Sequence, residues 1–204
     1  MSLTPEFNEF VANWLNKADQ IALKELPTYF DKFFTLYVVY NRLYAEATFV
    51  LARSGQINIE RRTSFPDREG ATNYLAKFIG SKNIIRAIEN NGEATEALNQ
   101  VEGLIERNVF SIKLHMVTGG RQRDKDEDLL RRLRSTAQNT KAEAILDLLY
   151  SIRCNTFHGH KGFKEVQTAI LAPAITLLRV LIALLKAKLA NNGIAPKNTD
   201  QHTH

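Results

Sequence analysis

The side chains best suited to chemistry lie together in one polar, basic stretch: Arg153, Asn155, His158, His160 and Lys161. An imidazole can transfer protons near neutral pH, and a guanidinium can hold phosphate oxygens and stabilise charge that develops on them. No group of carboxylates accompanies these residues in the sequence, which disfavours metal-assisted hydrolysis. The residue types therefore point to metal-independent attack on a phosphodiester.

The same stretch allows two other kinds of chemistry through Cys154. With His158 and His160 it could bind zinc, but a fourth ligand is missing and the spacing matches no standard zinc site. As a nucleophile it is disfavoured, because a cysteine beside an apolar helical stripe usually serves packing. A single cysteine excludes an intramolecular disulfide, and this is typical of a reducing compartment, here predicted to be the cytoplasm.

The positive charge of the chain is concentrated around this stretch. The net charge is +5, yet residues 148–199 hold seven basic side chains and a single acid, Glu165, for a local charge of +6. A basic surface of this kind suits a partner that carries phosphate groups. A solvated helix face is the alternative explanation of the same pattern.

A helix must carry the first half of the stretch. Thr140 and Glu143 have the spacing of a capping box and predict a helix that begins at about Lys141. Gly159 is a suitable residue to end it. The buried stripe of this helix is predicted to contain Ile145, Leu148, Leu149 and Ile152.

Arg153 and His158 do not share a face of that helix. Five residues at 100° each place them about 140° apart around the axis. His158 would lie at the helix end, where the dipole favours the imidazolium form by up to about 1 kcal/mol. The two side chains can therefore act together only across a broken helix or from two protomers.

The most hydrophobic segment of the chain, Ala169–Leu185, follows the stretch. It contains Pro173, Thr176 and Arg179, and it is shorter than the roughly 20 apolar residues that span a bilayer. We therefore expect a buried core helix and no membrane association.

The first half of the chain predicts a second long helix. Its periodic pattern begins at Pro27 and ends at Gly55, with an aromatic stripe that is typical of a core. Asn41 is the polar exception within that stripe, and it requires a hydrogen-bond partner if it is buried.

The remaining patterns indicate an all-α fold, an up-and-down helical bundle with this long helix in its N-terminal half and a long apolar C-terminal helix. Residues 1–193 are predicted to form one domain, 56–135 a possible insertion of short helices, and 194–204 a flexible tail. Within the insertion, Val109–Val117 is predicted to be an extended connector or a continuation of a helix.

Arg153, four residues and then His158, with Asn155 two positions after the arginine, resembles the motif of the HEPN superfamily (higher eukaryotes and prokaryotes nucleotide-binding). The segment from Phe34 to Tyr44 also resembles an early helix of some bacterial members. The resemblance covers mainly residues 28–54 and 140–190.

The resemblance implies an α-helical bundle, often a homodimer in which both protomers form one RNA-cleaving site. Arg153 would hold the scissile phosphate and His158 would transfer protons, while the 2′-hydroxyl attacks to leave a 2′,3′-cyclic phosphate. Asn155 would orient these groups or bind phosphate, and His160, Lys161 and Asn41 are supporting candidates. No metal and no cofactor are implied.

Members of that superfamily commonly serve as toxins of toxin–antitoxin pairs or in phage defence, so an antitoxin or another regulatory protein is an expected partner besides RNA. Other members bind nucleotides or proteins without catalysis, and fold alone does not decide between these functions. A non-catalytic binding module and a purely structural helical domain therefore stay open as alternatives.

Overall fold

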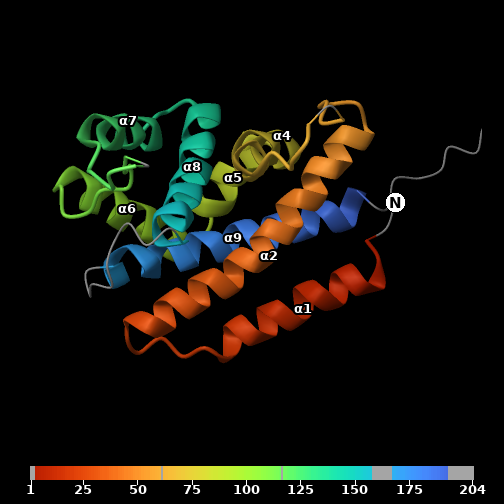
Figure 1. The fold of residues 1–204 in the computed structure, drawn as a ribbon, viewed down its shortest axis with the longest axis horizontal. Helices are drawn as coiled ribbons and strands as arrows, with labels where there is room; N and C mark the ends of the chain where they lie inside the picture. Colours follow the sequence, from red (N-terminus) through yellow and green to blue (C-terminus); the bar gives the residue numbers. More distant parts are fainter. Residues whose placement is uncertain (1–2, 61, 116, 158–166, 193–204) are drawn as a thin grey trace, which may run out of the picture.

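The computed structural model describes residues 3–60, 62–115, 117–157 and 167–192, and within these ranges it is an all-α helical bundle (Figure 1). The predicted fold class is confirmed. An isolated β-bridge between Leu114 and Arg121 accompanies the helices. The elements in chain order are α1 (Pro5–Gln20), α2 (Leu26–Arg53), α3 (Asp67–Glu69), the π-helical turn η1 (Gly70–Tyr74), α4 (Leu75–Ile79), α5 (Ser81–Glu89), α6 (Gly92–Glu106), α7 (Arg123–Leu133), α8 (Gln138–Phe157) and α9 (Thr168–Asn192).

The two longest helices, α2 and α9, pack against each other and form the centre of the bundle (Figure 1). Helix α2 begins as its sequence predicts, with Pro27 in the first turn and a reciprocal capping box between Glu25 and Thr28. Its aromatic stripe is core, because Phe33, Tyr40 and Tyr44 are almost fully buried. Helix α1 lies along the outer side of α2.

Helix α9 is long and apolar enough, by length and composition, to cross a membrane. A core helix of a soluble protein passes the same test, and 56% of its most apolar window is buried inside the fold. Leu177, Leu178, Leu181 and Leu185 are fully enclosed. The inward side of α9 therefore has the burial expected of a core helix, and the absence of membrane association stays a prediction.

Helix α8 crosses α9 and packs between α7 on one side and α5, α4 and η1 on the other (Figure 1). It begins at Gln138, three residues before the predicted start at Lys141. The reason lies upstream, where the Ser135 hydroxyl accepts a hydrogen bond from the amide of Ala137 and turns the chain into the helix early. Thr140 is therefore already inside the first turn.

The segment between α6 and α7 is an extended connector, not a continuation of helix α6. Asn108 adopts a left-handed conformation (φ 53°) directly after α6, and this ends the helix. The chain returns toward α7 through a turn at Gly119 (φ 65°), closed by a hydrogen bond from the amide of Gln122 to the carbonyl of Lys113. The helices of the 56–135 region share the hydrophobic core of the rest of the chain.

Candidate functional site

The structure describes half of the predicted site residues. Arg153 and Asn155 lie on the last turn of α8, and Asn41 is an exposed residue of α2. The exposure of Asn41 removes the need for a buried partner. His158, His160 and Lys161 lie outside the described residues.

Arg153 lies at the surface of the bundle, and three of the described residues contact its guanidinium. One guanidinium nitrogen, Nη1, is 3.7 Å from a carboxylate oxygen of Asp67 and 3.9 Å from the sulfur of Cys154. Its central carbon lies 5.8 Å from the centre of the Tyr37 ring, a cation–π contact. The side chain is 25% exposed. Arg153 is therefore oriented by the fold and still reachable from solvent.

Burial alone would lower the pKa of Arg153, because it disfavours the charged form. The hydrogen bond with Cys154 and the charges of Tyr37 and Asp67 oppose that effect, and the pKa is raised overall. Arg153 is consequently a permanent cation. It can bind and stabilise an anion, but it cannot exchange protons.

Asp67 is the residue that sequence reasoning missed. It begins α3, and its carboxylate accepts hydrogen bonds from the hydroxyl of Tyr44 and, at 3.3 Å, from the hydroxyl of Tyr150. Burial, then the hydrogen bond to Asp67, raises the pKa of Tyr44, so this phenol stays protonated as a donor. The pair of residues Pro66–Asp67 signals a helix start, but nothing local indicates that Asp67 faces a residue 86 positions later.

Tyr37 supplies its ring to Arg153 while its hydroxyl is enclosed without a hydrogen-bond partner in the described part of the chain. The residue is only 5% exposed. Burial, followed by the neighbouring phenols Tyr40 and Tyr44, raises the pKa of Tyr37 well above its usual value. A buried hydroxyl without a partner destabilises the folded state by roughly 1–3 kcal/mol. The favourable contribution of Tyr37 at this position therefore comes from its ring.

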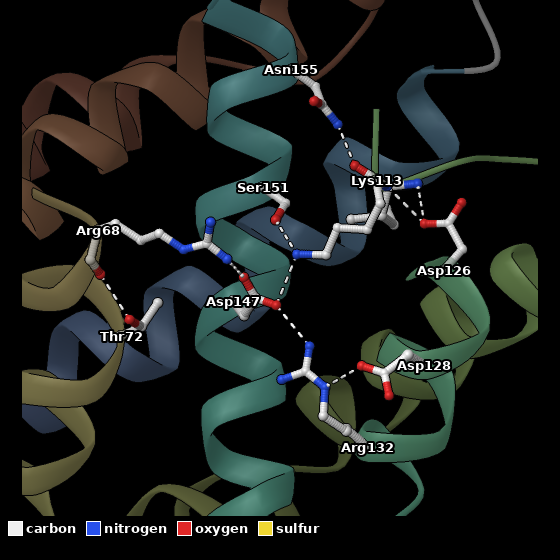
Figure 2. A network of polar contacts seen from close by, with 10 residues as sticks. Arg68, Thr72, Lys113, Asp126, Asp128, Arg132, Asp147, Ser151 and Asn155 are labelled. Atoms are coloured by element: carbon white, nitrogen blue, oxygen red, sulfur yellow. Dashed lines mark hydrogen bonds and ion pairs between the residues drawn. The ribbon is translucent and has the colours of Figure 1, made fainter. Parts of the chain in front are cut away.

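Asn155 faces away from Arg153. Residues two positions apart are separated by about 200° around a helix, so the two side chains leave opposite sides of α8. The amide nitrogen of Asn155 donates a hydrogen bond to the carbonyl of Ile112 in the connector between α6 and α7 (Figure 2). The structure therefore does not bring Arg153 and Asn155 together, and it gives Asn155 a structural contact.

A second polar cluster surrounds Asp147 on α8, whose side chain is 10% exposed (Figure 2). One carboxylate oxygen is 3.2 Å from Arg68, and the other is 2.8 Å from Lys113 and 2.9 Å from Arg132. Lys113 also donates a hydrogen bond of 2.8 Å to the hydroxyl of Ser151. One buried carboxylate thus binds cations from three segments of the chain: α3, the connector and α7.

Burial alone would raise the pKa of Asp147, but the charge of Lys113 and the hydrogen bonds from Lys113 and Arg132 outweigh it and the pKa is lowered. Asp147 is therefore ionised at neutral pH. The pKa of Lys113 is also lowered, first by burial, although Asp147 acts in the opposite direction. The charges of Arg68 and Arg132 contribute further to this lowering.

Within the described ranges no group of three or more His, Cys, Asp or Glu side chains is arranged to hold a metal ion. The zinc alternative is not decided by this observation, because two of its three ligands, His158 and His160, lie outside those ranges.

No family model, curated protein or solved structure matches this chain. The likeness to the HEPN superfamily therefore depends on the Arg153 motif with its helical context and on the segment from Phe34 to Tyr44.

Proposed function

We propose that this protein is a metal-independent endoribonuclease of the HEPN type. The observation that carries the proposal is the state of Arg153: a partly exposed guanidinium, oriented by Asp67 and Tyr37, on the last turn of the helix that leads to His158. An oriented arginine at the edge of an all-α bundle is suited to hold a phosphodiester, because its planar group of donors matches phosphate oxygens.

In the proposed reaction the 2′-hydroxyl of the RNA attacks the adjacent phosphorus. The bond from phosphorus to the 5′-oxygen of the next nucleotide breaks, leaving a 2′,3′-cyclic phosphate and a 5′-hydroxyl. Arg153 holds the non-bridging oxygens and stabilises the charge that develops on them. His158 transfers the proton that leaves the 2′-hydroxyl or reaches the 5′-oxygen. His160 and Lys161 are proposed to bind flanking phosphates.

Asp67 is a positioning residue in this scheme. At 3.7 Å its carboxylate is beyond ordinary hydrogen-bond distance from the Arg153 guanidinium, so it orients the cation without occupying its donors. Tyr44 and Tyr150 fix the carboxylate in turn. Replacement of Asp67 by asparagine keeps the shape of this support and removes its charge.

The test is cleavage of a labelled RNA in the presence of EDTA. We expect Arg153→Ala and His158→Ala to reduce the rate by at least about 100-fold, and Asp67→Asn by about tenfold. Arg179→Ala is the matched control and should leave the rate unchanged, since Arg179 is an arginine of α9 that is likewise paired with one aspartate, Asp19.

Circular dichroism of each variant checks that the fold is retained. Vigorous cleavage by folded His158→Ala protein would contradict the role given to His158. A requirement for a divalent metal would contradict the proposed mechanism.

The proposal extends to the assembly and its setting. Arg153 and His158 are expected to converge from two protomers, with RNA as the substrate and an antitoxin or similar regulator as the protein partner. A role in a toxin–antitoxin pair or in phage defence, in the cytoplasm, follows from the resemblance.

A non-catalytic nucleotide- or protein-binding module is the second candidate, and a specific observation favours it. Asn155 donates its amide to Ile112, and Arg153 has the carboxylate of Asp67 beside it, so both motif residues have contacts that serve the fold. RNA that stays intact after incubation with folded protein, together with measurable nucleotide binding, would support this candidate over the nuclease.

A further inference from the structure

A buried carboxylate, that of Asp147, is the centre of a cluster of charged side chains. Three cations, from Arg68, Lys113 and Arg132, converge on this carboxylate, and Asp128 contacts Arg132 as a second carboxylate. Asp126 uses its oxygens on the Ser111 hydroxyl and two main-chain amides.

Arg68 is the member of this cluster that combines exposure with a fixed position. Its side chain is 65% exposed, while one guanidinium nitrogen is anchored 3.2 Å from Asp147 (Figure 2). An arginine that is already held in place loses less side-chain freedom when it binds an anion than a mobile surface arginine does. Arg68 is therefore prepared to present its outer donors to a ligand.

Helix α3 joins this cluster to Arg153. Its first residue, Asp67, contacts Arg153, and the next residue, Arg68, contacts Asp147. Both contacts end on α8, where six residues separate Asp147 from Arg153, or about 9 Å along the helix axis. Asp147 and Arg153 also lie about 120° apart around α8, so α3 is the element that connects the two contacts, through its adjacent residues Asp67 and Arg68.

We propose that Arg68, anchored on Asp147, forms a second phosphate-binding site that holds the backbone of a single-stranded RNA next to the phosphate bound at Arg153. The inference rests on the proposed function, because it identifies how the same substrate is held. Each phosphate contact adds affinity without sequence preference.

Electrostatic repulsion within the cluster supports this assignment. Burial first, and then the charges of Arg68 and Arg132, lower the pKa of Lys113 in spite of its contact with Asp147. A phosphate at the outer donors of Arg68 reduces this repulsion between cations.

The test is binding of a single-stranded RNA whose 2′-hydroxyls are methylated, so that attack by the 2′-oxygen cannot cleave it. Fluorescence anisotropy at several salt concentrations gives the affinity and its salt dependence. We expect Arg68→Gln to weaken binding about tenfold at low salt and to reduce the slope of log K against log salt by about 0.7. Arg68→Lys should keep the slope and lose less affinity, because it keeps the charge but not the planar fork.

Arg179→Gln is the matched control, since it also removes one arginine that is paired with one aspartate. Equal losses of RNA affinity in Arg179→Gln and Arg68→Gln would show that only the net charge of the protein matters, and would overturn the inference. Unchanged affinity and slope for folded Arg68→Gln would overturn it as well. A parallel titration with ATP tests a free nucleotide as the ligand: weaker ATP binding with unchanged RNA binding would contradict the assignment to an RNA strand.

Cleavage of unmodified RNA separates this inference from the proposed function. If the wild-type protein binds the methylated RNA through Arg68 but leaves unmodified RNA intact, the phosphate-binding site is supported and the nuclease proposal is refuted. If the wild-type protein cleaves RNA, and the Arg68→Gln protein binds and cleaves it as well as the wild type does, the nuclease proposal is supported and the phosphate-binding site is refuted.

Discussion

At Arg153 a carboxylate, an aromatic ring and a thiol meet one guanidinium. The three contacts are unequal in kind. Asp67 supplies charge and is itself fixed by two phenols, whereas Tyr37 supplies a ring face whose hydroxyl finds no partner in the described part of the chain. The two tyrosines on α2 that surround this site, Tyr37 and Tyr44, should therefore respond in opposite ways to the loss of a hydroxyl.

We expect Tyr37→Phe to leave the free energy of unfolding unchanged or to raise it by up to about 1 kcal/mol, because it removes a buried hydroxyl that has no partner and keeps the ring. Tyr44→Phe is the matched variant and should lower it by about 1–2 kcal/mol, since the carboxylate of Asp67 loses a donor. Urea unfolding measures both values. A larger loss for Tyr37→Phe than for Tyr44→Phe would contradict this description of the site.

At the scale of the elements, Asp147 connects α8 to three segments that are distant in sequence. Arg68 belongs to α3, Lys113 to the connector, and Arg132 to α7. The connector is also held by Asp126 and by Asn155. These contacts hold the described part of the connector beside α8.

We expect Asp147→Asn to lower the free energy of unfolding by about 3 kcal/mol at neutral pH, because the largely buried ammonium of Lys113 loses its charged partner. The pKa of Asp147 is lower in the folded than in the unfolded state. The stabilising contribution of Asp147 is therefore complete above its pKa in the unfolded state, which is near 4. It is lost as the pH falls through the lower pKa of the folded state.

Unfolding measured from pH 7 to pH 2 checks both parts of this prediction. The wild-type protein should lose stability below about pH 4 more steeply than Asp147→Asn, so the difference between them should shrink at acid pH. A difference that stays constant across this range would show that Asp147 stabilises the fold by packing instead of by charge.

Sequence patterns predicted the long elements well and the contacts between distant segments poorly. The bounds of α2 and the burial of α9 follow from apolar periodicity and end signals that are local in the chain. The start of α8 was predicted three residues late, because the turn at Ser135 competes with the capping pattern at Thr140. Asp67 and the partners of Asp147 could not be predicted, since their roles depend on residues far away in sequence.

At the scale of the whole molecule, the placement of Arg153 bears on assembly. Its guanidinium is fixed on the side of α8 that faces Asp67 and Tyr37. If α8 continued as a helix, His158 would point about 140° away from it. Under the proposed mechanism a phosphate must reach both groups at once. A second protomer, related by two-fold symmetry, satisfies this requirement by placing its His158 opposite the Arg153 of the first.

We therefore expect sedimentation velocity to find a species of twice the 23.1 kDa chain mass. The nuclease activity per chain should fall when the protein is diluted below its dimer dissociation constant, because a shared site separates with the protomers. Added Arg153→Ala chains should lower wild-type activity by forming mixed dimers, while added Arg179→Ala chains, which retain both motif residues, should not. The opposite result is an activity per chain that stays constant at concentrations where only the monomer is found. Arg153 and His158 of the same chain would then have to act together, and α8 would have to break before His158.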